Sequence, residues 1–347
     1  MKLNQVLNGY RVVTRPTNAD AGKCLWAFAE KGGGEFFIKE FLDPKIPKAD
    51  SMGTVEDKER RFAECERFAK RHTDIMAALR ADDVHAGNLV LAVDFFAVGT
   101  RYYKVTPRVR PADAAARDLD TRGQLVLLKT LVDSLVLLHA KGIVHGDLKP
   151  ENILLTPARK GSLLVAKLID FDDAYQAGAP PMAEVIGGNP LYGAPEWLRY
   201  LRGDQGAHAR SLTQAADVFA VGLLIHTYLF GVPPGYGEGH ESPAAAVLAG
   251  APLAWDSRLG GRIRRLLESL TAADHRARPV IADVAAALDE PDVLVSAAVS
   301  PSPPPVPPPS TPPPGGGART SRVLVNTTKT AARTSSARLR INLTDKN

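Results

Sequence analysis

The sequence predicts an α+β protein with a strand-rich first part, at about residues 1–105, and a mainly helical second part, at about residues 110–290. Short runs of β-branched and aromatic residues between turn residues dominate the first part. Longer segments with apolar residues at helical spacing dominate the second part. With 45% hydrophobic residues, the chain of 347 residues can bury a substantial core.

A tail of different composition follows this folded part. Residues 291–318 are rich in proline and glycine, which predicts a spacer in polyproline II conformation. Residues 319–347 are basic and rich in serine and threonine, which predicts disorder. From residue 301 on, seven basic residues face one aspartate, so the tail carries +6 and the remainder −1 of the total charge of +5. We therefore expect no nucleic-acid binding by the folded part, and an acidic partner, a phosphopeptide reader or a membrane surface for the tail.

Cysteine content and apolar runs bear on the compartment. Two cysteines, Cys24 and Cys65, are too few for a disulfide framework and predict a reducing, cytoplasmic location. The first residues lack a long apolar run, so we expect no signal peptide. The apolar stretch 218–232 is about one turn short of a bilayer, so we expect a buried core helix and no transmembrane segment.

The expected elements can be read along the chain. The predicted strands cover residues 9–13, 24–29, 35–41, 89–93 and 102–105. A turn at residues 17–22 separates the first two strands. Helices are predicted at about residues 55–79 and at residues 124–140, the second ending near Gly142.

The most informative stretch is His-Gly-Asp-Leu-Lys-Pro-Glu-Asn-Ile-Leu-Leu at residues 145–155. It spaces Asp147, Lys149 and Asn152 closely ahead of an apolar strand. An aspartate can accept the proton of an attacking hydroxyl, a lysine can neutralise a phosphoryl oxygen, and an asparagine oxygen can hold Mg²⁺. Phosphoryl transfer depends mostly on such positioning and charge stabilisation, so the set indicates this chemistry.

The stretch closely resembles the catalytic loop of Ser/Thr protein kinases, of the bacterial, eukaryotic-like type. Four further matches follow in the family's order: Asp170 in Asp-Phe-Asp, Glu196 in Ala-Pro-Glu, Asp217 at the head of an apolar helix, and Arg278. The resemblance covers about residues 9–290. It implies a two-lobed kinase domain over residues 1–290, with a small lobe to about residue 105 and a large lobe from about residue 110.

The resemblance implies a catalytic set that uses ATP and Mg²⁺ to phosphorylate a protein substrate. Asp147 is the expected base and Lys149 the charge stabiliser. Asn152 and Asp170 are the expected metal ligands.

ATP would be bound mainly by the small lobe. Lys39, which follows an apolar strand, would bind the phosphates and pair with a helix glutamate, for which Glu64 is preferred over Glu66. Thr106 and Arg108 lie in the expected hinge at residues 106–109, where adenine would meet the backbone.

Three more residues are expected to act structurally. Arg278 would pair with Glu196, and Asp217 would hold the catalytic loop through hydrogen bonds to its backbone.

Several positions depart from the family pattern. Gly146 stands where many kinases have arginine, Asp172 stands where they have glycine, and the turn at residues 17–22 lacks most of the usual glycines. Residues 173–188 contain no serine or threonine. The sequence therefore predicts an activity that is not switched on by Ser/Thr phosphorylation in this segment.

Two other functions remain open. A small-molecule phosphotransferase similar to aminoglycoside and choline kinases would fit the runs 145–147 and 169–172, whereas Lys149, Glu196 and Arg278 favour a protein kinase. A pseudokinase scaffold would explain the degenerate turn, but the retention of Lys39 and Asp147 argues against it.

Overall fold

The computed structural model describes residues 1–19, 22–48, 53–79, 86–158, 163–291 and 293–294. The predicted tail and nearly all of the predicted linker lie outside these residues, and so does Asp20 of the predicted turn.

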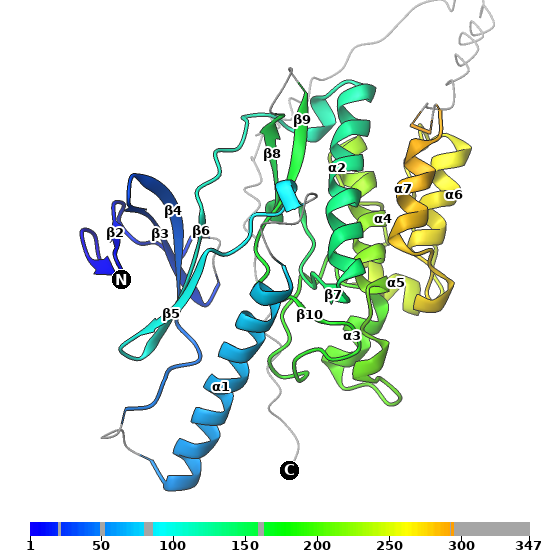
Figure 1. Ribbon diagram of the computed structural model, residues 1–347. Coiled ribbons are helices and arrows are strands. Elements are labelled where there is room, and N and C mark those ends of the chain that lie inside the picture. Colours follow the sequence, from blue (N-terminus) through cyan, green and yellow to red (C-terminus); the bar gives the residue numbers. More distant parts are fainter. Residues whose placement is uncertain (20–21, 49–52, 80–85, 159–162, 292, 295–347) are drawn as a thin grey trace, which may run out of the picture. The chain divides into compact units, whose positions relative to one another are not determined.

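The first part of the chain forms a six-stranded antiparallel sheet in the order β1-β2-β3-β4-β6-β5 (Figure 1). Its strands are β1 (Val6–Leu7), β2 (Tyr10–Val12), β3 (Cys24–Lys31), β4 (Gly34–Phe41), β5 (Asp94–Val98) and β6 (Arg101–Pro107). Lys39 of β4 is directly opposite Lys104 of β6. Because cross-strand partners point to the same face of a sheet, these two lysines lie side by side.

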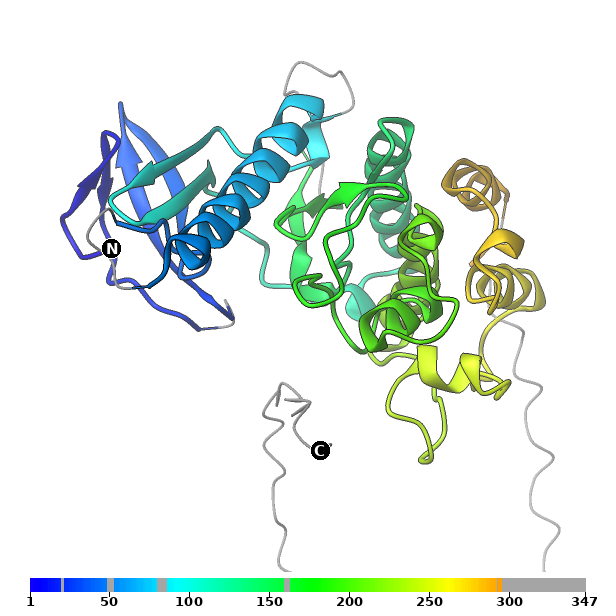
Figure 2. The same ribbon diagram turned by 90° about the horizontal axis from the view of Figure 1, so that it is seen from below.

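Helix α1 (Val55–Ala78) accompanies this sheet (Figures 1 and 2). It begins at Thr54, whose hydroxyl accepts a hydrogen bond from the backbone N–H of Asp57 at 3.1 Å. Its buried Cys65 packs with Phe41 of β4 and Tyr102 of β6. The apolar side of α1 is thereby fixed against the sheet.

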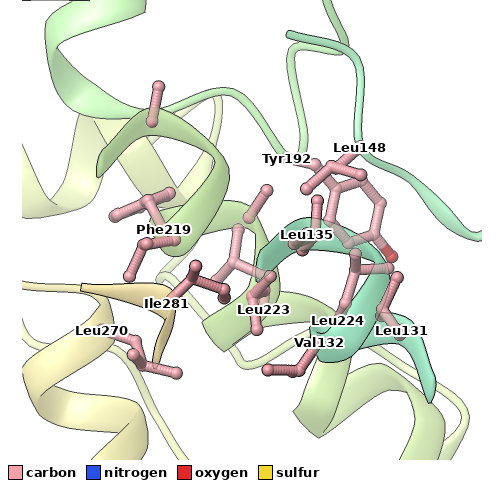
Figure 3. Packing of buried hydrophobic residues seen from close by; sticks show 14 of the residues in the cluster. Leu131, Val132, Leu135, Leu148, Tyr192, Phe219, Leu223, Leu224, Leu270 and Ile281 are labelled. Carbon is pink, nitrogen blue, oxygen red and sulfur yellow. The ribbon is translucent and has the colours of Figure 1, made fainter. Parts of the chain in front are cut away.

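The second part is mainly helical. Its helices are α2 (Thr121–Ala140), α3 (Pro195–Arg202), α4 (Ala215–Phe230), α5 (Pro243–Leu248), α6 (Gly261–Leu270) and α7 (Ile281–Asp289). Figure 3 shows the core, in which Leu131 and Leu135 of α2 lie near Leu223 and Leu224 of α4. Among the described helices, α2 is long and apolar enough to span a bilayer. Half of its apolar stretch, however, is buried inside this core.

Short strands and 3₁₀ turns lie between these helices, and most of the predicted catalytic residues lie in the loops beside the strands. These are β7 (Ile143–Val144), β8 (Ile153–Pro157), β9 (Leu164–Leu168) and β10 (Tyr175–Gln176), with 3₁₀ turns at Ala86–Asn88, Ala116–Asp118, Pro150–Asn152, Ala209–Ser211 and His275–Ala277. β8 pairs with β9, and β7 pairs with β10. The loop between β7 and β8 therefore lies beside the turn that follows β9.

Two predicted boundaries are wrong. Residues 89–93 do not form a strand of the sheet, because the backbone N–H of Val90 donates to the carbonyl of Leu168 in β9 at 2.9 Å, and the strand β5 begins at Asp94. The predicted hinge residues Thr106 and Pro107 still belong to β6, opposite Phe37 and Phe36.

Candidate active site

The loop at residues 145–149 is held by a buried aspartate from α4. Asp217 accepts hydrogen bonds from the backbone N–H groups of His145 at 2.8 Å and Gly146 at 3.1 Å, and its Oδ2 lies 3.0 Å from Nε2 of His139. From the other side, Leu148 is 2% exposed and packs into the large core (Figure 3). The loop is thus fixed at its backbone and by one apolar anchor.

Gly146 is required by a close backbone approach. Its φ is +78°, in the left-handed region, and a Cβ at this position would lie 2.7 Å from the carbonyl oxygen of Asp173. The arginine that many kinases carry here would not fit this geometry.

Asp147 has one occupied and one free carboxylate oxygen. Its Oδ2 accepts hydrogen bonds from Nζ of Lys149 at 2.6 Å and Nδ2 of Asn152 at 3.0 Å. Its Oδ1 is buried and has no hydrogen-bond partner among the described residues. Oδ1 is therefore the carboxylate oxygen that is left to accept a hydrogen bond from a bound hydroxyl.

The residues that could hold a metal meet at the end of β9. The backbone N–H of Ile169 donates to the carbonyl of Asn152 at 3.0 Å, which brings Asn152 next to the Asp170 turn. Asn152 uses its amide nitrogen on Asp147, which leaves its amide oxygen as an acceptor. Asp170 has φ of +62°. An amide oxygen and a carboxylate are ligands that suit Mg²⁺.

Lys39 lies in a cluster of two lysines and two aspartates. Its Nζ is 2.8 Å from Oδ1 of Asp170 and 2.6 Å from Oδ2 of Asp172, while Nζ of Lys104 is 2.8 Å from Oδ1 of Asp172. Burial raises the pKa of Asp172, but the charges of Lys104 and Lys39 outweigh it and hold the pKa well below its usual range.

The predicted ion pair between Lys39 and Glu64 is wrong. Among the described residues, the carboxylates bound to Lys39 come from the turn after β9 and not from α1. The register of α1 brings Arg71 and His72 into the field of Asp172 instead. Glu64 precedes His72 by eight residues, about 12 Å along the helix axis.

Lys104, Arg71 and His72 were missed in the sequence. A signal existed for Lys104, because it interrupts the otherwise apolar run Tyr102-Tyr103-Lys104-Val105 of a strand that proves central. Such a lysine in a buried strand needs an anionic partner.

The two residues predicted to contact adenine lie at the end of β6. Thr106 is partly buried on β6. Arg108 directs its side chain to Glu35 at 3.1 Å and stacks over Phe28, with 3.9 Å from Cζ to the ring centre. The Arg108 side chain therefore covers Phe28 of β3 and pairs with Glu35 of β4 just beyond the end of β6.

Arg278 and Glu196 form a buried bidentate ion pair. Nη1 and Nη2 of Arg278 donate to the two carboxylate oxygens of Glu196 at 2.7 and 2.8 Å. The same guanidinium donates to the carbonyls of Ala215 and Ala272. The pair joins the start of α3 to the start of α4 and to the turn before α7.

Asp173 lies beside Asp147. Burial, together with the charges of Asp147, Asp172 and Asp170, raises the pKa of Asp173 to about 7. Its carboxylate lies so close to Gly187 that a Cβ there would meet Oδ1 at 2.0 Å. Nε1 of Trp197 donates to the carbonyl of Gly187 at 2.8 Å, which fixes this part of the segment.

Comparison with known proteins agrees with this geometry. The family model described as "Protein kinase domain" matches residues 72–288. This span is more than half of the chain, and the chain belongs to the Ser/Thr protein kinase family. The predicted fold class, with a strand-rich first part and a helical second part, is confirmed.

Similar proteins are named Ser/Thr or calcium-dependent protein kinases. Calcium-dependent protein kinase 21 of Oryza sativa subsp. japonica is 31% identical over 171 residues, which is 49% of this chain and 26% of that protein. Calcium-dependent protein kinase 8 of the same organism is 27% identical over 252 residues, 69% of this chain and 43% of that protein. Probable serine/threonine-protein kinase fhkD of Dictyostelium discoideum is 34% identical over 138 residues, 39% of this chain and 17% of that protein. The matched regions therefore cover less than half of each of these relatives.

Proposed function

We propose that the protein is a Ser/Thr protein kinase that transfers the γ-phosphoryl group of ATP, with Mg²⁺, to hydroxyl groups of a protein substrate. The observation that carries the proposal is the Asp147 carboxylate. One oxygen accepts hydrogen bonds from Lys149 and Asn152, and the other is buried with no partner among the described residues. This is the condition expected of a group that accepts a substrate proton.

In this proposal each residue has a definite task. Asp147 would orient the substrate hydroxyl and take its proton through Oδ1. Lys149 would neutralise a phosphoryl oxygen. Lys39 would bind phosphate oxygens of ATP, and Asn152 and Asp170 would hold Mg²⁺. Bound ATP would supply the phosphoryl group, and bound Mg²⁺ would neutralise part of its negative charge.

The proposal is tested by incubating the full chain with γ-labelled ATP, Mg²⁺ and either a generic basic protein or a pool of aminoglycoside and choline acceptors. We expect label on serine or threonine of protein. Asp147→Asn should lower kcat by about 10²- to 10⁴-fold because it removes the base. Asp283→Asn, which changes an exposed aspartate of α7, is the matched control and should retain wild-type activity.

The other outcomes have clear meanings. Label confined to small acceptors would identify a small-molecule phosphotransferase. Absence of label from every acceptor, in a protein with an intact melting transition, would favour the scaffold.

We also propose that activity needs no phosphate in the segment 173–188. Tyr175 carries the only hydroxyl side chain of this segment, is 2% exposed, and belongs to β10, paired with β7. Protein produced in a phosphatase-treated form should keep its full activity. Mapping of an activating phosphate to Tyr175 would contradict this.

The cellular setting belongs to the same proposal. The free thiols of Cys24 and Cys65 support a reducing compartment such as the cytoplasm. A bacterial type of kinase and an acidic or phosphopeptide-reading partner for the tail stay predictions. Deletion of residues 300–347, followed by measurement of partner capture and autophosphorylation, tests the role of the tail.

A further inference from the structure

The carboxylate of Asp172 bridges two lysines on neighbouring strands. Oδ2 binds Lys39 of β4 at 2.6 Å, and Oδ1 binds Lys104 of β6 at 2.8 Å. The side chains of Asp172, Lys39 and Lys104 are only 15%, 12% and 8% exposed. Each carboxylate oxygen has its own cationic partner, so Asp172 is held over the face of the sheet to which both lysines point.

Helix α1 does not offer Lys39 a competing acid. The α1 residues that couple electrostatically to Asp172 are Arg71 and the buried His72. His72 is 2% exposed and packs against Phe41, Phe68 and Phe95, with ring centres 5.1, 4.4 and 5.0 Å away. A movement that brought Glu64 to Lys39 would have to pull His72 out of this ring cluster.

Lys104 has a separate reason to be present. A lysine in a central strand with an 8% exposed side chain is unfavourable without an anion. Asp172 supplies that anion, and Lys104 in return occupies the oxygen of Asp172 that Lys39 does not use. Lys39 itself also reaches Asp170, which is a proposed metal ligand. Asp172 is therefore the partner that can stay on Lys39 when Asp170 turns to a metal.

We propose that Asp172 is the positioning residue for Lys39 in nucleotide binding, in the place that a glutamate of the helix beside the sheet takes in other kinases, and that Lys104 holds Asp172 in this position. The inference rests on the proposed function, because it deepens the role of the ATP site. It assigns to Asp172 an orienting role through Lys39 and no contact with the reacting atoms.

The test compares full-length variants by the Kd for a fluorescent ATP analogue with Mg²⁺ and by KM for ATP and kcat in phosphate transfer. Asp172→Asn should raise Kd and KM by about tenfold and lower kcat by up to about 100-fold, because a displaced lysine loses its alignment. Asp172→Glu keeps the charge and should recover most of the affinity. Glu59→Gln, an exposed change on α1, is the matched control and should behave as wild type.

Two further variants separate the competing explanations. Glu64→Gln should change Kd and KM by less than about twofold. If it weakens binding as much as Asp172→Asn, α1 supplies the acid and the proposal is overturned. The double variant Asp172→Asn/Lys104→Met should have Kd and KM values no higher than those of the weaker-binding single variant, Asp172→Asn or Lys104→Met. The reason is that either change alone already breaks the interaction between Asp172 and Lys104. Additive losses would remove the role of Lys104.

The failure of the inference differs from the failure of the proposed function. A wild-type protein that binds the analogue but transfers no phosphate would refute the kinase activity, while the Kd values would still decide the role of Asp172. A wild-type protein that transfers phosphate and an Asp172→Asn variant with unchanged Kd and KM would refute the inference alone. A kcat loss at unchanged Kd and KM would indicate a structural role for Asp172 and would also refute it.

Discussion

Removal of the guanidinium of Arg278 should destabilise the protein more than any single surface change. Arg278→Met leaves the carboxylate of Glu196 buried and unpaired and takes donors from the carbonyls of Ala215 and Ala272. The Arg278 side chain is fully buried and that of Glu196 is 8% exposed. Breaking a buried ion pair by removing one partner costs about 3–5 kcal/mol.

This free energy converts into a measurable shift in melting temperature. An unfolding entropy of about 2.1 cal/mol/K per residue gives about 0.6 kcal/mol/K for a folded part of about 290 residues. A loss of 3–5 kcal/mol therefore lowers Tm by about 5–8 °C. Thermal unfolding followed by circular dichroism, together with urea unfolding, measures both quantities without any need for activity.

A surface ion pair provides the matched control. Arg262 pairs with Glu290 at 2.8 Å, but the two side chains are 58% and 54% exposed. Arg262→Met should therefore cost about 0–1 kcal/mol. The double variant Arg278→Met/Glu196→Met leaves no buried charge and should be more stable than Arg278→Met alone. A Tm for Arg278→Met within 1–2 °C of the Arg262→Met value (about 1 kcal/mol or less) would refute the reasoning.

Three further predictions follow from the loop and its neighbours. Gly146→Ala combines a left-handed φ with a Cβ 2.7 Å from the Asp173 carbonyl, so we expect a loss of stability of about 2 kcal/mol or more and a lower kcat; an unchanged Tm would contradict this. Burial raises the pKa of Asp173 to about 7 in the folded protein, from an ordinary value of 3.8. Between these values the folded state holds a proton that the unfolded state has lost, so this group makes stability fall as pH rises through the window. Asp173→Asn should therefore reduce the loss of stability with rising pH, and it should increase the free energy of unfolding at pH 8 by about 1–3 kcal/mol. Urea unfolding without nucleotide or metal measures this free energy, and a pH profile identical to that of the wild type would exclude the effect. Asp217→Asn weakens two charge-assisted hydrogen bonds to the loop backbone, so it should lower stability by about 1–3 kcal/mol and reduce kcat more than it raises KM for ATP, which steady-state kinetics would show.

The sequence led correctly to those features that depend on local motifs. The spacing of Asp147, Lys149 and Asn152 is short, and the structure brings these three side chains together. The pair of Glu196 and Arg278 spans 82 residues, but each member lies in a recognisable motif of the family. Motif order was therefore sufficient to predict contacts that composition or periodicity alone could not.

The errors concern relations between elements. Apolar periodicity predicted the helix α1 but not which of its turns faces Lys39. Glu64 was therefore predicted near Lys39, whereas in the structure His72 couples to the Lys39 cluster. Leu89 and Val90, at the start of the run 89–93, are buried against β9, and this cannot be distinguished from an apolar strand of the sheet without the tertiary partner. Lys104 was correctly predicted to lie on a strand, but its ion pair was missed because no local motif identifies Asp172 as its partner.

The cluster of Lys39, Lys104, Asp170 and Asp172 is electrically balanced, and this has an evolutionary consequence. A chain with the family's usual glycine at position 172 would leave the buried ammonium of Lys104 without its counter-charge, and a chain that lost Lys104 first would leave an excess acid beside Asp170, the proposed metal ligand. The two positions are therefore epistatic, and neither substitution is neutral without the other. We expect homologues with glycine at the position of Asp172 to have an uncharged residue at that of Lys104, so that the two sites change as a pair along the lineage.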